Sequence, residues 1–505
     1  MNGAARPAAP VSLTWLLDGI APIAPTPATI SDLTLDSREA RPGSLFLALR
    51  GRGSHGLAHA ADAVGRGAGA VLWEPDGHSV PPALPASVYV APVADLSRLA
   101  GRIADRYFQW PSSALTVFGI TGTNGKTTCA YLLTQCLNRL GMAAGYVGTL
   151  GWGRIGALEP LAHTTPDVVT VHRMLAALRA SGVGDVAMEV SSHALDQDRV
   201  AGVRFAGAAF TNLSRDHLDY HGSMQEYGEA KARLFEFPGL RQIIINVGDP
   251  HGRAMAQRLA GSAPLIAVWV GAGESGWLAG RTLRAAAVET LPRGLAVTLD
   301  GTFGGATLRT RLLGRFNAEN CLVVLACLAG RGVPLAQAVD ALGGCAPPPG
   351  RMQLVEPKDD RRALAVIDYA HTPDALAQAL AALREHCPGR LWCVFGCGGD
   401  RDAGKRPLMG AAADEIADRI IVTDDNPRSE DPGRIVRDIV GGIAPGRARV
   451  IHDRAQAIRA ALEEAVAGDV VLIAGKGHED YQIYGAERRA FSDLHEVERL
   501  LGEAA

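Results

Sequence analysis

The chain has 505 residues, of which 47% are hydrophobic and 20% charged, and its formal net charge is −3. At roughly 150 residues per domain, this length predicts about three domains. The apolar share supplies several packed cores and excludes a disordered chain. The small net charge excludes bulk attraction to nucleic acid or anionic lipid as the main activity. No uncharged apolar run approaches about 18 residues, so no membrane-inserted helix is expected, and residues 1–10 lack the apolar centre of a secretion signal.

The first domain is expected over residues 1–110 as a small α/β unit. Short strands are predicted at 45–49, 70–73 and 88–91, between turns rich in glycine and proline, and a helix follows over 95–107. The segment QWPSS at 109–113 is typical of a linker.

The second domain is expected over residues 111–346. Buried strands are predicted at 115–121, 186–190, 208–213 and 242–247, separated by glycine-rich turns and helices. Such runs indicate a mostly parallel P-loop-type sheet with helices on both faces. The segment CAPPPG at 345–350 cannot lie inside a helix or strand and marks the second boundary.

The third domain is expected over residues 347–505. Strands are predicted at 365–369, 391–395, 419–423 and 470–474, and a helix over 374–386 places Leu376, Leu380 and Leu383 on one face. This alternation predicts a Rossmann-like doubly wound domain, whose ligands bind at the carboxyl ends of the strands. The fold class is therefore α/β in three domains.

The eight cysteines match no zinc-binding spacing. We interpret them as reduced thiols of a cytoplasmic protein, mostly core filler rather than catalytic nucleophiles.

Lysine is scarce in this chain. Of the 50 lysine and arginine residues only five are lysines, namely Lys126, Lys231, Lys358, Lys405 and Lys476. A lysine retained against such a bias is a candidate for chemistry that arginine cannot perform, because a compact amine can lose its proton and a guanidinium cannot. Lys358, in the charged loop EPKDDRR, is expected to be an ordinary exposed residue.

A phosphate-binding loop is indicated by TGTNGKTT at 121–128, which follows a predicted strand and opens a predicted helix at 129–140. Its glycines let backbone N–H groups approach phosphate at the positive end of the helix. Lys126 would reach the β- and γ-phosphates, and Thr127 would hold Mg²⁺. The general spacing has a further glycine upstream, where this chain has Ile120. A glycine-rich turn with a stray lysine is the alternative that the flanking strand and helix disfavour.

Two polar clusters follow neighbouring predicted strands. In MEVSSHA at 188–194, Glu189 is placed to bind a metal ion, and in TNLSRDHLD at 211–219, His217 is a second candidate ligand. The alternative is that these clusters cap helices, through Ser191, Asn212 and Asp216. The functional interpretation depends on both clusters falling at one edge of the sheet.

Lys231 lies in YGEAKARLF at 227–235, which is typical of a helix. Position alone favours a surface lysine, whereas the scarcity of lysine favours a functional one.

Four polar turns follow four predicted strands of the third domain: DYAHTPD at 368–374, GCGGDRD at 396–402, DDNPR at 424–428 and GKGHE at 475–479. Thr372 is a candidate helix cap, and Pro373 suits a first helical turn. Any one could be an ordinary turn, but together they predict a binding rim.

The motifs GTNGKTT, MEVSSHAL, TNLSRDHLDYHG, GRFNAEN, DYAHTPDAL, GCGGDRD, DDNPR and GKGHEDYQ together resemble the Mur ligases, and they occur in family order. The resemblance runs from LTLDSR at 33–38 to Tyr481. It is closest to the branch that adds the third peptide residue in peptidoglycan synthesis. The short phosphate loop is also the form of this family.

The resemblance implies an ATP-dependent acid–amino-acid ligase of the cytoplasm, acting in cell wall biogenesis. ATP would phosphorylate the γ-carboxylate of D-glutamate in UDP-N-acetylmuramoyl-L-alanyl-D-glutamate. An amine of meso-2,6-diaminopimelate would attack the acyl phosphate, giving an amide, ADP and phosphate. ATP and Mg²⁺ are the implied cofactors. No nucleic acid, membrane insertion or obligate protein partner is expected.

The resemblance also implies roles for individual residues. The catalytic residues would be Lys126, Glu189, His217 and Lys231, with Lys231 carbamoylated (N6-carboxylysine). The metal ligands would be Thr127, Glu189, His217 and Lys231. ATP would be bound by Gly122, Thr123, Asn124, Gly125, Lys126, Thr127, Thr128, Asn317, Asn320, Arg351, Asp368 and His371. The UDP-substrate would be bound by Leu35, Ser37, Thr164, Thr165, Ser191, Gln197 and Arg199. Diaminopimelate would be bound by Arg401, Asp425, Asn426, Pro427, Arg428, Gly475 and Glu479.

Three alternatives remain open. The same ligase could use L-lysine, but the arginine that ends DNPR resembles the diaminopimelate type, since a guanidinium fits the distal carboxylate that lysine lacks. A folylpolyglutamate synthetase-like ligase would share the phosphate loop, and DDNPR and GKGHE argue against it. An ATPase-coupled switch would hydrolyse ATP without ligation, so phosphate release in the absence of the two substrates distinguishes it.

Overall fold

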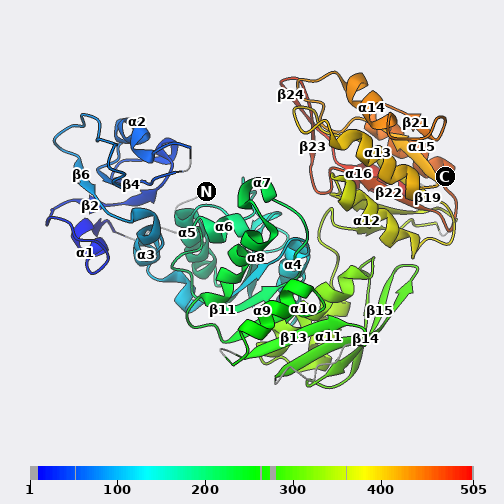
Figure 1. The fold of residues 1–505 in the computed structure, drawn as a ribbon, viewed down its shortest axis with the longest axis horizontal. Coiled ribbons are helices and arrows are strands. Elements are labelled where there is room, and N and C mark those ends of the chain that lie inside the picture. Colours follow the sequence, from blue (N-terminus) through cyan, green and yellow to red (C-terminus); the bar gives the residue numbers. More distant parts are fainter. Residues whose placement is uncertain (1–8, 52, 262–263, 273–279, 360, 503–505) are drawn as a thin grey trace. The chain divides into compact units, whose positions relative to one another are not determined.

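The structure is a computed structural model, which describes residues 9–51, 53–261, 264–272, 280–359 and 361–502 (Figure 1). Most of the segment examined for a secretion signal, residues 1–8, lies outside the described residues. Contacts divide the chain into two compact units. The first comprises Met1–Val268, Gly276–Arg281 and Ala326–Gly332, and the second comprises Trp269–Ser275, Thr282–Leu325 and Val333–Ala505. The division into three domains stays a prediction.

The first unit begins with a small parallel sheet. Its strands lie in chain order, β3 (Asp32–Thr34), β4 (Ser44–Ala48), β5 (Ala70–Trp73) and β6 (Tyr89–Pro92). Alternate residues of β4 point to opposite faces, as strand geometry requires. Leu45 and Leu47 pack in a core with α1 (Leu13–Leu17) and α3 (Leu96–Tyr107). Phe46 packs on the other face with α2 (Ala60–Gly65). The short elements here are β1 (Val11–Ser12), β2 (Thr29–Ile30), η1 (Ser37–Glu39) and η2 (Gly56–His59).

The larger sheet of the first unit carries the phosphate loop. Its strands lie in the order β13-β12-β11-β7-β10-β8-β9, and all pair in parallel except the edge strand β9. Their bounds are β7 (Thr116–Thr121), β8 (Ala144–Gly148), β9 (Gly151–Gly153), β10 (Asp185–Glu189), β11 (Phe205–Phe210), β12 (Gln242–Asn246) and β13 (Leu265–Val270). The helices between them are α4 (Lys126–Arg139), α5 (Val168–Ala180), α6 (Ser192–Asp196), α7 (Leu218–His221), α8 (Met224–Ala232) and α9 (Pro250–Arg258), with η3 (Pro111–Ala114) and η4 (Arg233–Glu236).

Three predicted boundaries are off by three residues: the start of α4 and both ends of β11, which ends at Phe210 rather than at residue 213. The helix after the phosphate loop begins at Lys126 rather than at residue 129, because Gly125, with φ +84°, already completes the turn into the helix. Strand β11 begins at Phe205 rather than at residue 208. Gly207 lies inside this strand, where a Cβ would come within 2.8 Å of the Phe118 ring, so tertiary packing and not a turn explains the glycine.

The second unit contains an antiparallel run of three strands, β14 (Arg281–Leu291), β15 (Gly294–Gly301) and β16 (Ala306–Thr310). The helices α10 (Phe316–Gly330) and α11 (Leu335–Gly343) follow in the chain. The CAPPPG segment lies between α11 and the next strand, inside the second unit, and its role as a domain boundary stays a prediction.

The sheet near the C-terminus has the strand order β17-β18-β22-β19-β20-β21, with only β17 antiparallel. Its strands are β17 (Gln353–Val355), β18 (Leu364–Asp368), β19 (Leu391–Phe395), β20 (Arg419–Val422), β21 (Ala448–Val450) and β22 (Val470–Ala474). Its helices are α12 (Pro373–Arg384), α13 (Lys405–Ile416), α14 (Pro432–Val440), α15 (Arg454–Glu464) and α16 (Asp493–Gly502), and β23 (Tyr481–Tyr484) forms a hairpin with β24 (Glu487–Ala490).

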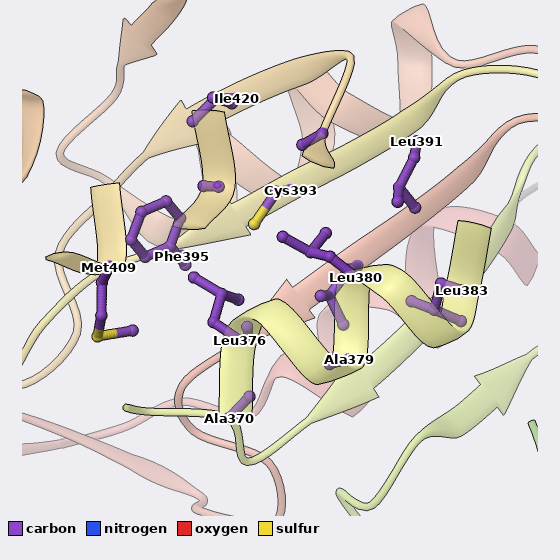
Figure 2. Packing of buried hydrophobic residues seen from close by; sticks show 14 of the residues in the cluster. Ala370, Leu376, Ala379, Leu380, Leu383, Leu391, Cys393, Phe395, Met409 and Ile420 are labelled. Carbon is purple, nitrogen blue, oxygen red and sulfur yellow. The ribbon is translucent and has the colours of Figure 1, made fainter. Parts of the chain in front are cut away.

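Helices cover both faces of this sheet, which confirms the doubly wound prediction. On one face Leu376, Leu380 and Leu383 of α12 pack with Cys393 and Phe395 of β19 (Figure 2). On the other face Trp392 and Val394 pack with residues of α15 and α16. Thr372 accepts a hydrogen bond from the Ala375 N–H, so the predicted cap and the proline after it begin α12.

All eight cysteines are buried and unpaired by disulfides, as expected of core residues. In the described part of the chain, every helix is too short or too polar to cross a membrane.

Candidate functional site

The loop between β7 and α4 has the geometry of a phosphate cradle. Gly122 has φ +149°, and a Cβ there would lie 1.9 Å from the Thr211 Oγ1. Thr211 and Asn212, at the end of β11, hold the loop from outside. The Thr211 hydroxyl donates to the Asn124 carbonyl at 2.6 Å, and the Asn124 N–H donates to the Asn212 Oδ1 at 2.9 Å. The loop is therefore fixed by the neighbouring strand end, at the N-terminus of a 14-residue helix suited to anions.

Two lysines converge on one carbonyl of this loop. Lys126 Nζ donates to the Gly122 carbonyl at 2.9 Å and to the Thr123 carbonyl at 2.8 Å. Lys231 Nζ donates to the same Gly122 carbonyl at 2.7 Å. Lys231 is 1% exposed, so the interpretation as a surface lysine is wrong. Burial, together with the neighbouring Lys126 ammonium, holds the pKa of Lys231 well below its usual value. Its amine is therefore predisposed to be neutral.

Glu189 lies at the carboxyl end of β10 and faces the first turn of α4. Its carboxylate is fully buried and accepts hydrogen bonds from the Thr127 hydroxyl at 2.9 Å and the Tyr146 hydroxyl at 2.5 Å. The Thr149 N–H and hydroxyl donate to it at 2.9 and 3.2 Å. A hydroxyl and a carboxylate that face each other are the hard oxygen donors that Mg²⁺ prefers, so Thr127 and Glu189 fit the predicted metal.

His217 lies in a group of aromatic side chains beside the phosphate loop. Its ring centroid is 4.8 Å from that of His193 and 6.2 Å from that of Tyr227. Tyr227 in turn contacts Lys231, whose Nζ lies 4.3 Å from the ring centroid, and its hydroxyl is 3.2 Å from the Thr123 Oγ1. The half-exposed imidazole of His217 and the buried Lys231 thus both lie beside the Tyr227 ring. Among the described residues, no cluster of three or more His, Cys, Asp or Glu side chains is placed to hold a metal ion.

Asn212 and Asp216 do not act as the side-chain caps considered from the sequence: Asn212 binds the loop, and α7 begins at its N-cap His217 without a side-chain cap. Ser191 does cap, accepting from the Ala194 N–H.

The residues predicted to hold the muramoyl-dipeptide form one hydrogen-bonded network. Arg199 donates to the Gln197 Oε1 at 2.6 Å and to the Thr165 carbonyl at 3.0 Å. The Thr165 hydroxyl donates to the Glu189 carbonyl at 2.9 Å and accepts from the Ser191 N–H at 3.2 Å. Thr164 lies 3.1 Å from the Thr149 hydroxyl. The network is therefore connected, through residues 149, 165 and 189, to the candidate metal site.

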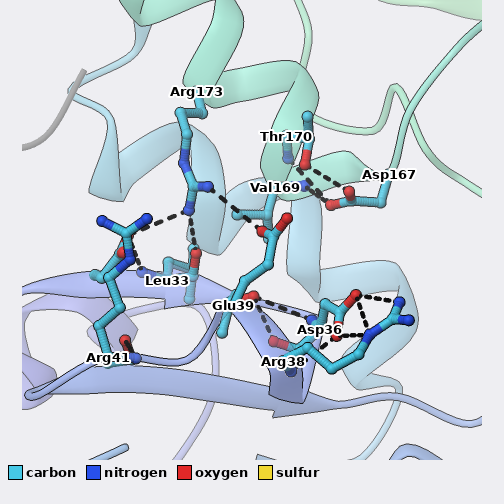
Figure 3. A network of polar contacts seen from close by, with 12 residues as sticks. Leu33, Asp36, Arg38, Glu39, Arg41, Asp167, Val169, Thr170 and Arg173 are labelled. Carbon is cyan, nitrogen blue, oxygen red and sulfur yellow. Dashed lines mark hydrogen bonds and ion pairs between the residues drawn. The ribbon is translucent and has the colours of Figure 1, made fainter. Parts of the chain in front are cut away.

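Leu35 and Ser37, predicted to contact the uridine end, lie beside β3 and in η1. Arg173 of α5 reaches this segment (Figure 3), donating to the Leu33 carbonyl at 2.6 Å and to Asp32 at 3.1 Å. Arg173, which lies on a helix packed in the larger sheet's part of the unit, thus holds in place the strand that precedes Leu35 and Ser37.

The second unit holds the remaining predicted nucleotide residues. Asp368, at the end of β18, accepts from the Met352 N–H at 2.7 Å and the Ala370 N–H at 2.8 Å, and burial raises its pKa. Arg351 lies over the Tyr369 ring, 4.9 Å from its centroid. His371 binds the Tyr369 carbonyl through Nδ1 at 2.9 Å. The predicted residues Asn317 and Asn320 both lie on α10, where the Asn320 side chain donates a hydrogen bond to the Asn317 Oδ1 at 2.8 Å.

The predicted amino-acid site lies at the carboxyl ends of β19, β20 and β22. Asn426 donates to the Glu479 carboxylate at 3.0 Å. A Cβ on Gly475 would lie 2.8 Å from the Asp425 Oδ2, so only glycine permits this approach. Arg428, with φ +54°, donates through NH1 to the Gly399 carbonyl at 2.8 Å. The predicted residues are thus brought to one rim.

The two arginines of this rim flank Gly398. A Cβ on that glycine would lie 2.7 Å from Arg428 NH1 and 3.8 Å from Arg401 Cγ. Pro427, which precedes Arg428, is buried. Guanidinium groups and carboxylates in one rim suit a zwitterionic end of an amino acid.

Several residues of these sites were missed from the sequence. Tyr146 and Thr149 lie in no predicted motif, and Tyr227 begins the segment YGEAKARLF, where the sequence analysis gave it no role. Lys476 lies inside the GKGHE motif and is one of the five lysines, so the scarcity of lysine could have identified it.

Comparison with protein families finds Mur ligase domains over most of the chain. Residues 29–108 match "Mur ligase family, catalytic domain", residues 120–328 match "Mur ligase middle domain", and residues 350–477 match "Mur ligase, glutamate ligase domain". A relative from Alkalilimnicola ehrlichii, named UDP-N-acetylmuramoyl-L-alanyl-D-glutamate--2,6-diaminopimelate ligase, is 49% identical over 482 residues, which are 94% of this chain and 95% of that protein.

Solved structures are similar over nearly the same span. One described as UDP-N-acetylmuramoyl-L-alanyl-D-glutamate--2,6-diaminopimelate ligase has a TM-score of 0.71 at 36% identity and covers 98% of this chain and 99% of that one. A MurF ligase from Thermotoga maritima, in complex with ADP, has a TM-score of 0.58 at 17% identity, covering 93% and 96%. The second similarity is one of fold alone.

Proposed function

Since the chain belongs to the Mur ligase family, we propose that it is the ATP-dependent ligase that joins meso-2,6-diaminopimelate to UDP-N-acetylmuramoyl-L-alanyl-D-glutamate in peptidoglycan precursor synthesis. The observation that carries the proposal is the match over 94% of the chain, at 49% identity, to a ligase of that name. All eight cysteines are buried and none forms a disulfide, which supports a reducing compartment, so we place the proposed reaction in the cytoplasm.

The phosphate loop would bind ATP. Its backbone, the dipole of α4 and the Lys126 ammonium offer positive charge to the phosphates, and phosphoryl transfer needs such positioning rather than a protein nucleophile. Asn317, Asn320, Arg351, Asp368 and His371 are the proposed further nucleotide contacts. Thr127 and Glu189 would hold Mg²⁺, with His217 and Lys231 as the remaining proposed ligands. When bound, the ion supplies charge neutralisation at the phosphates.

Lys231 would carry a carbamate. Its neutral amine nitrogen attacks the carbon of CO₂, one N–C bond forms, and one proton leaves to solvent, so the side chain changes from neutral to −1. The support is its burial and its lowered pKa beside Lys126, since only an unprotonated amine has the lone pair for this attack. The carbamate anion would be balanced by Lys126 and by the metal.

The substrates would lie against the two networks already described. Thr164, Thr165, Ser191, Gln197 and Arg199 would hold the muramoyl-dipeptide, with Leu35 and Ser37 at the uridine end. The rim formed by Arg401, Asp425, Asn426, Pro427, Arg428, Gly475 and Glu479 would hold diaminopimelate.

Phosphate release tests the function. We expect ATP turnover only when UDP-N-acetylmuramoyl-L-alanyl-D-glutamate and diaminopimelate are both present, with one phosphate formed per amide bond. L-Lysine in place of diaminopimelate is expected to be a poor substrate. Hydrolysis of ATP without either substrate would favour an ATPase switch, and turnover with a folate and glutamate would favour a folylpolyglutamate synthetase-like ligase.

A further inference from the structure

A fully buried lysine lies beneath the proposed amino-acid site. Lys476 is 0% exposed, and its Nζ faces three side-chain oxygens. The distances are 3.5 Å to Asp425 Oδ1, 3.3 Å to Asn426 Oδ1 and 3.3 Å to Glu479 Oε2. An ammonium has three N–H donors and no acceptor, so its hydrogen-bonding geometry matches this set of acceptors.

We propose that Lys476 is a positioning residue that holds the Asp425 and Glu479 carboxylates in place and aimed at the distal ammonium of diaminopimelate. The inference rests on the proposed function. It adds a residue to which the sequence analysis assigned no role, and it specifies the end of the substrate that the residue serves.

Charge balance is the first step of the argument. Lys476 lies between the two carboxylates and donates to both Asp425 and Glu479, while Asn426 accepts from Lys476 and donates to Glu479 at 3.0 Å. Two carboxylates that face one nitrogen repel each other unless that nitrogen carries a positive charge. With Lys476 in place, the trio carries one net negative charge. That charge matches the single positive charge of an incoming ammonium.

Neighbouring charges do not perform this task. Arg454 lies close enough to attract Asp425 and Glu479, but it is already ion-paired with the buried Asp493. Its Nε and NH2 donate to the two carboxylate oxygens of Asp493, each at 2.7 Å. Tyr481 places its ring 5.4 Å from Lys476 Nζ, and burial raises its pKa, so it is neutral at physiological pH. Burial raises the pKa of Tyr369 in the same way. On the rim, Arg428 and Arg401 lie beside Gly398, where a distal carboxylate would bind.

An arginine could not replace this lysine. The site is closed to solvent and converges on one nitrogen, whereas a guanidinium is a wide planar fork. This agrees with the retention of a lysine in a chain that uses arginine for most of its positive charge.

The test compares two amino acids on the variant Lys476→Met. Diaminopimelate has both a distal ammonium and a distal carboxylate, and L-2-aminopimelate has only the carboxylate. We expect KM for diaminopimelate to rise about ten- to hundredfold, the range for loss of a charged hydrogen-bonded contact. For aminopimelate, kcat/KM (or the inhibition constant, if turnover is slow) should change much less, and KM for ATP should not change.

The split between KM and kcat gives a second readout. Because Lys476 is proposed to place the substrate through the two carboxylates, Lys476→Met should raise KM for diaminopimelate much more than it lowers kcat. The matched control is Lys358→Met, at an exposed lysine, which should leave both constants unchanged.

Equal losses for both amino acids would overturn the inference and leave Lys476 a structural residue. If circular dichroism shows that Lys476→Met does not fold, the same comparisons of the two amino acids and of KM with kcat are made on Lys476→Gln, which keeps a hydrogen-bond donor without the charge. Failure of the wild type to turn over diaminopimelate would instead contradict the proposed function.

Discussion

Replacing Lys231 with arginine is the most direct test of the carbamate. Lys126 and Lys231 both lie within 3 Å of the Gly122 carbonyl oxygen, so their nitrogens are at most about 6 Å apart. At an effective dielectric constant of about 20, two positive charges at that distance repel by about 3 kcal/mol. A lysine avoids this repulsion by losing its proton, but an arginine cannot.

We expect the Lys231→Arg and Lys231→Met variants to lose activity to a similar extent, with kcat about 10²- to 10³-fold below wild type, the range for loss of one transition-state electrostatic contact. Arginine keeps the length and the charge, so a residue that only packed or supplied positive charge would tolerate it. A carbamate would be replaced by a group of the opposite sign.

Stability should separate the two variants. The unfolded lysine has a pKa near 10.5, and the folded pKa is lower, so the unfolded state binds more protons between the two values and wild-type stability rises with pH across that window. In CO₂-free buffer at neutral pH, Lys231→Met should therefore have a higher free energy of unfolding than wild type, and the difference should shrink as the pH approaches 10.5. Lys231→Arg should be the least stable of the three.

Steady-state phosphate release, with denaturant unfolding of the same samples, measures both effects. ¹³CO₂ should give a carbamate carbon signal by NMR in the wild type and none in Lys231→Arg. Lys358→Arg, at an exposed position, is the control and should match the wild type throughout. Substantial turnover by Lys231→Arg would refute the carbamate.

Three further predictions concern other groups. Arg428→Ala should lower kcat/KM for diaminopimelate about 10- to 150-fold and for L-lysine much less, because lysine lacks the distal carboxylate. Equal losses for the two amino acids would mean that Arg428 only holds the loop through its contact with the Gly399 carbonyl. Glu189→Gln should weaken Mg²⁺-dependent nucleotide binding about 10- to 100-fold in calorimetric titrations, and unchanged affinity would remove Glu189 from the metal site. Asp105 has a pKa raised to about 6 by burial, so the folded state binds more protons than the unfolded state between pH 3.8 and 6 and wild-type stability falls as pH rises through that window. Asp105→Asn should therefore be more stable than wild type by up to about 3 kcal/mol at pH 8, with no difference below about pH 4, and a constant difference in chemical denaturation would contradict this reasoning.

The elements that sequence pattern predicted best are those whose burial is uniform. Strands β19 and β22 have the predicted bounds because each is a run of five residues buried on both faces. The start of α12 followed from a local cap and a proline, which act within one turn. The start of β11 could not be predicted from local sequence, because the glycine at position 207 is required by close packing against the Phe118 ring. Phe118 lies nearly 90 residues earlier in the chain.

The residues of the candidate site also divide into those that local sequence predicts and those that it does not. Glycine-rich turns after strands identified the phosphate loop and the rim near the C-terminus, since parallel strands bring their carboxyl ends to one edge. The burial of Lys231 could not be predicted, because α8 contains several polar residues and its lysine is enclosed by contacts of the folded chain, among them those with the Gly122 carbonyl and the Tyr227 ring. Tyr146 and Thr149 were missed for a related reason: they bind the Glu189 carboxylate from β8 and the turn after it, a segment for which the sequence analysis predicted no motif.

The scarcity of lysine was the most informative compositional signal, and the structure gives a physical reason for the lysines that are present. Lys126 and Lys231 share one carbonyl oxygen, and Lys476 is enclosed by three side-chain oxygens. In the first case two compact amines approach one oxygen, and in the second one nitrogen faces three oxygens, and the wide planar fork of a guanidinium fits neither arrangement. Lys405, which donates to the His371 carbonyl at 2.8 Å, reaches the nucleotide residues proposed in the second unit. Lys358 alone is exposed in a charged loop, where either cation would serve. Replacing each lysine in turn with arginine should therefore leave only Lys358→Arg fully active, and full activity of the arginine variants at 126, 231 and 476 would show that the scarcity is coding bias alone.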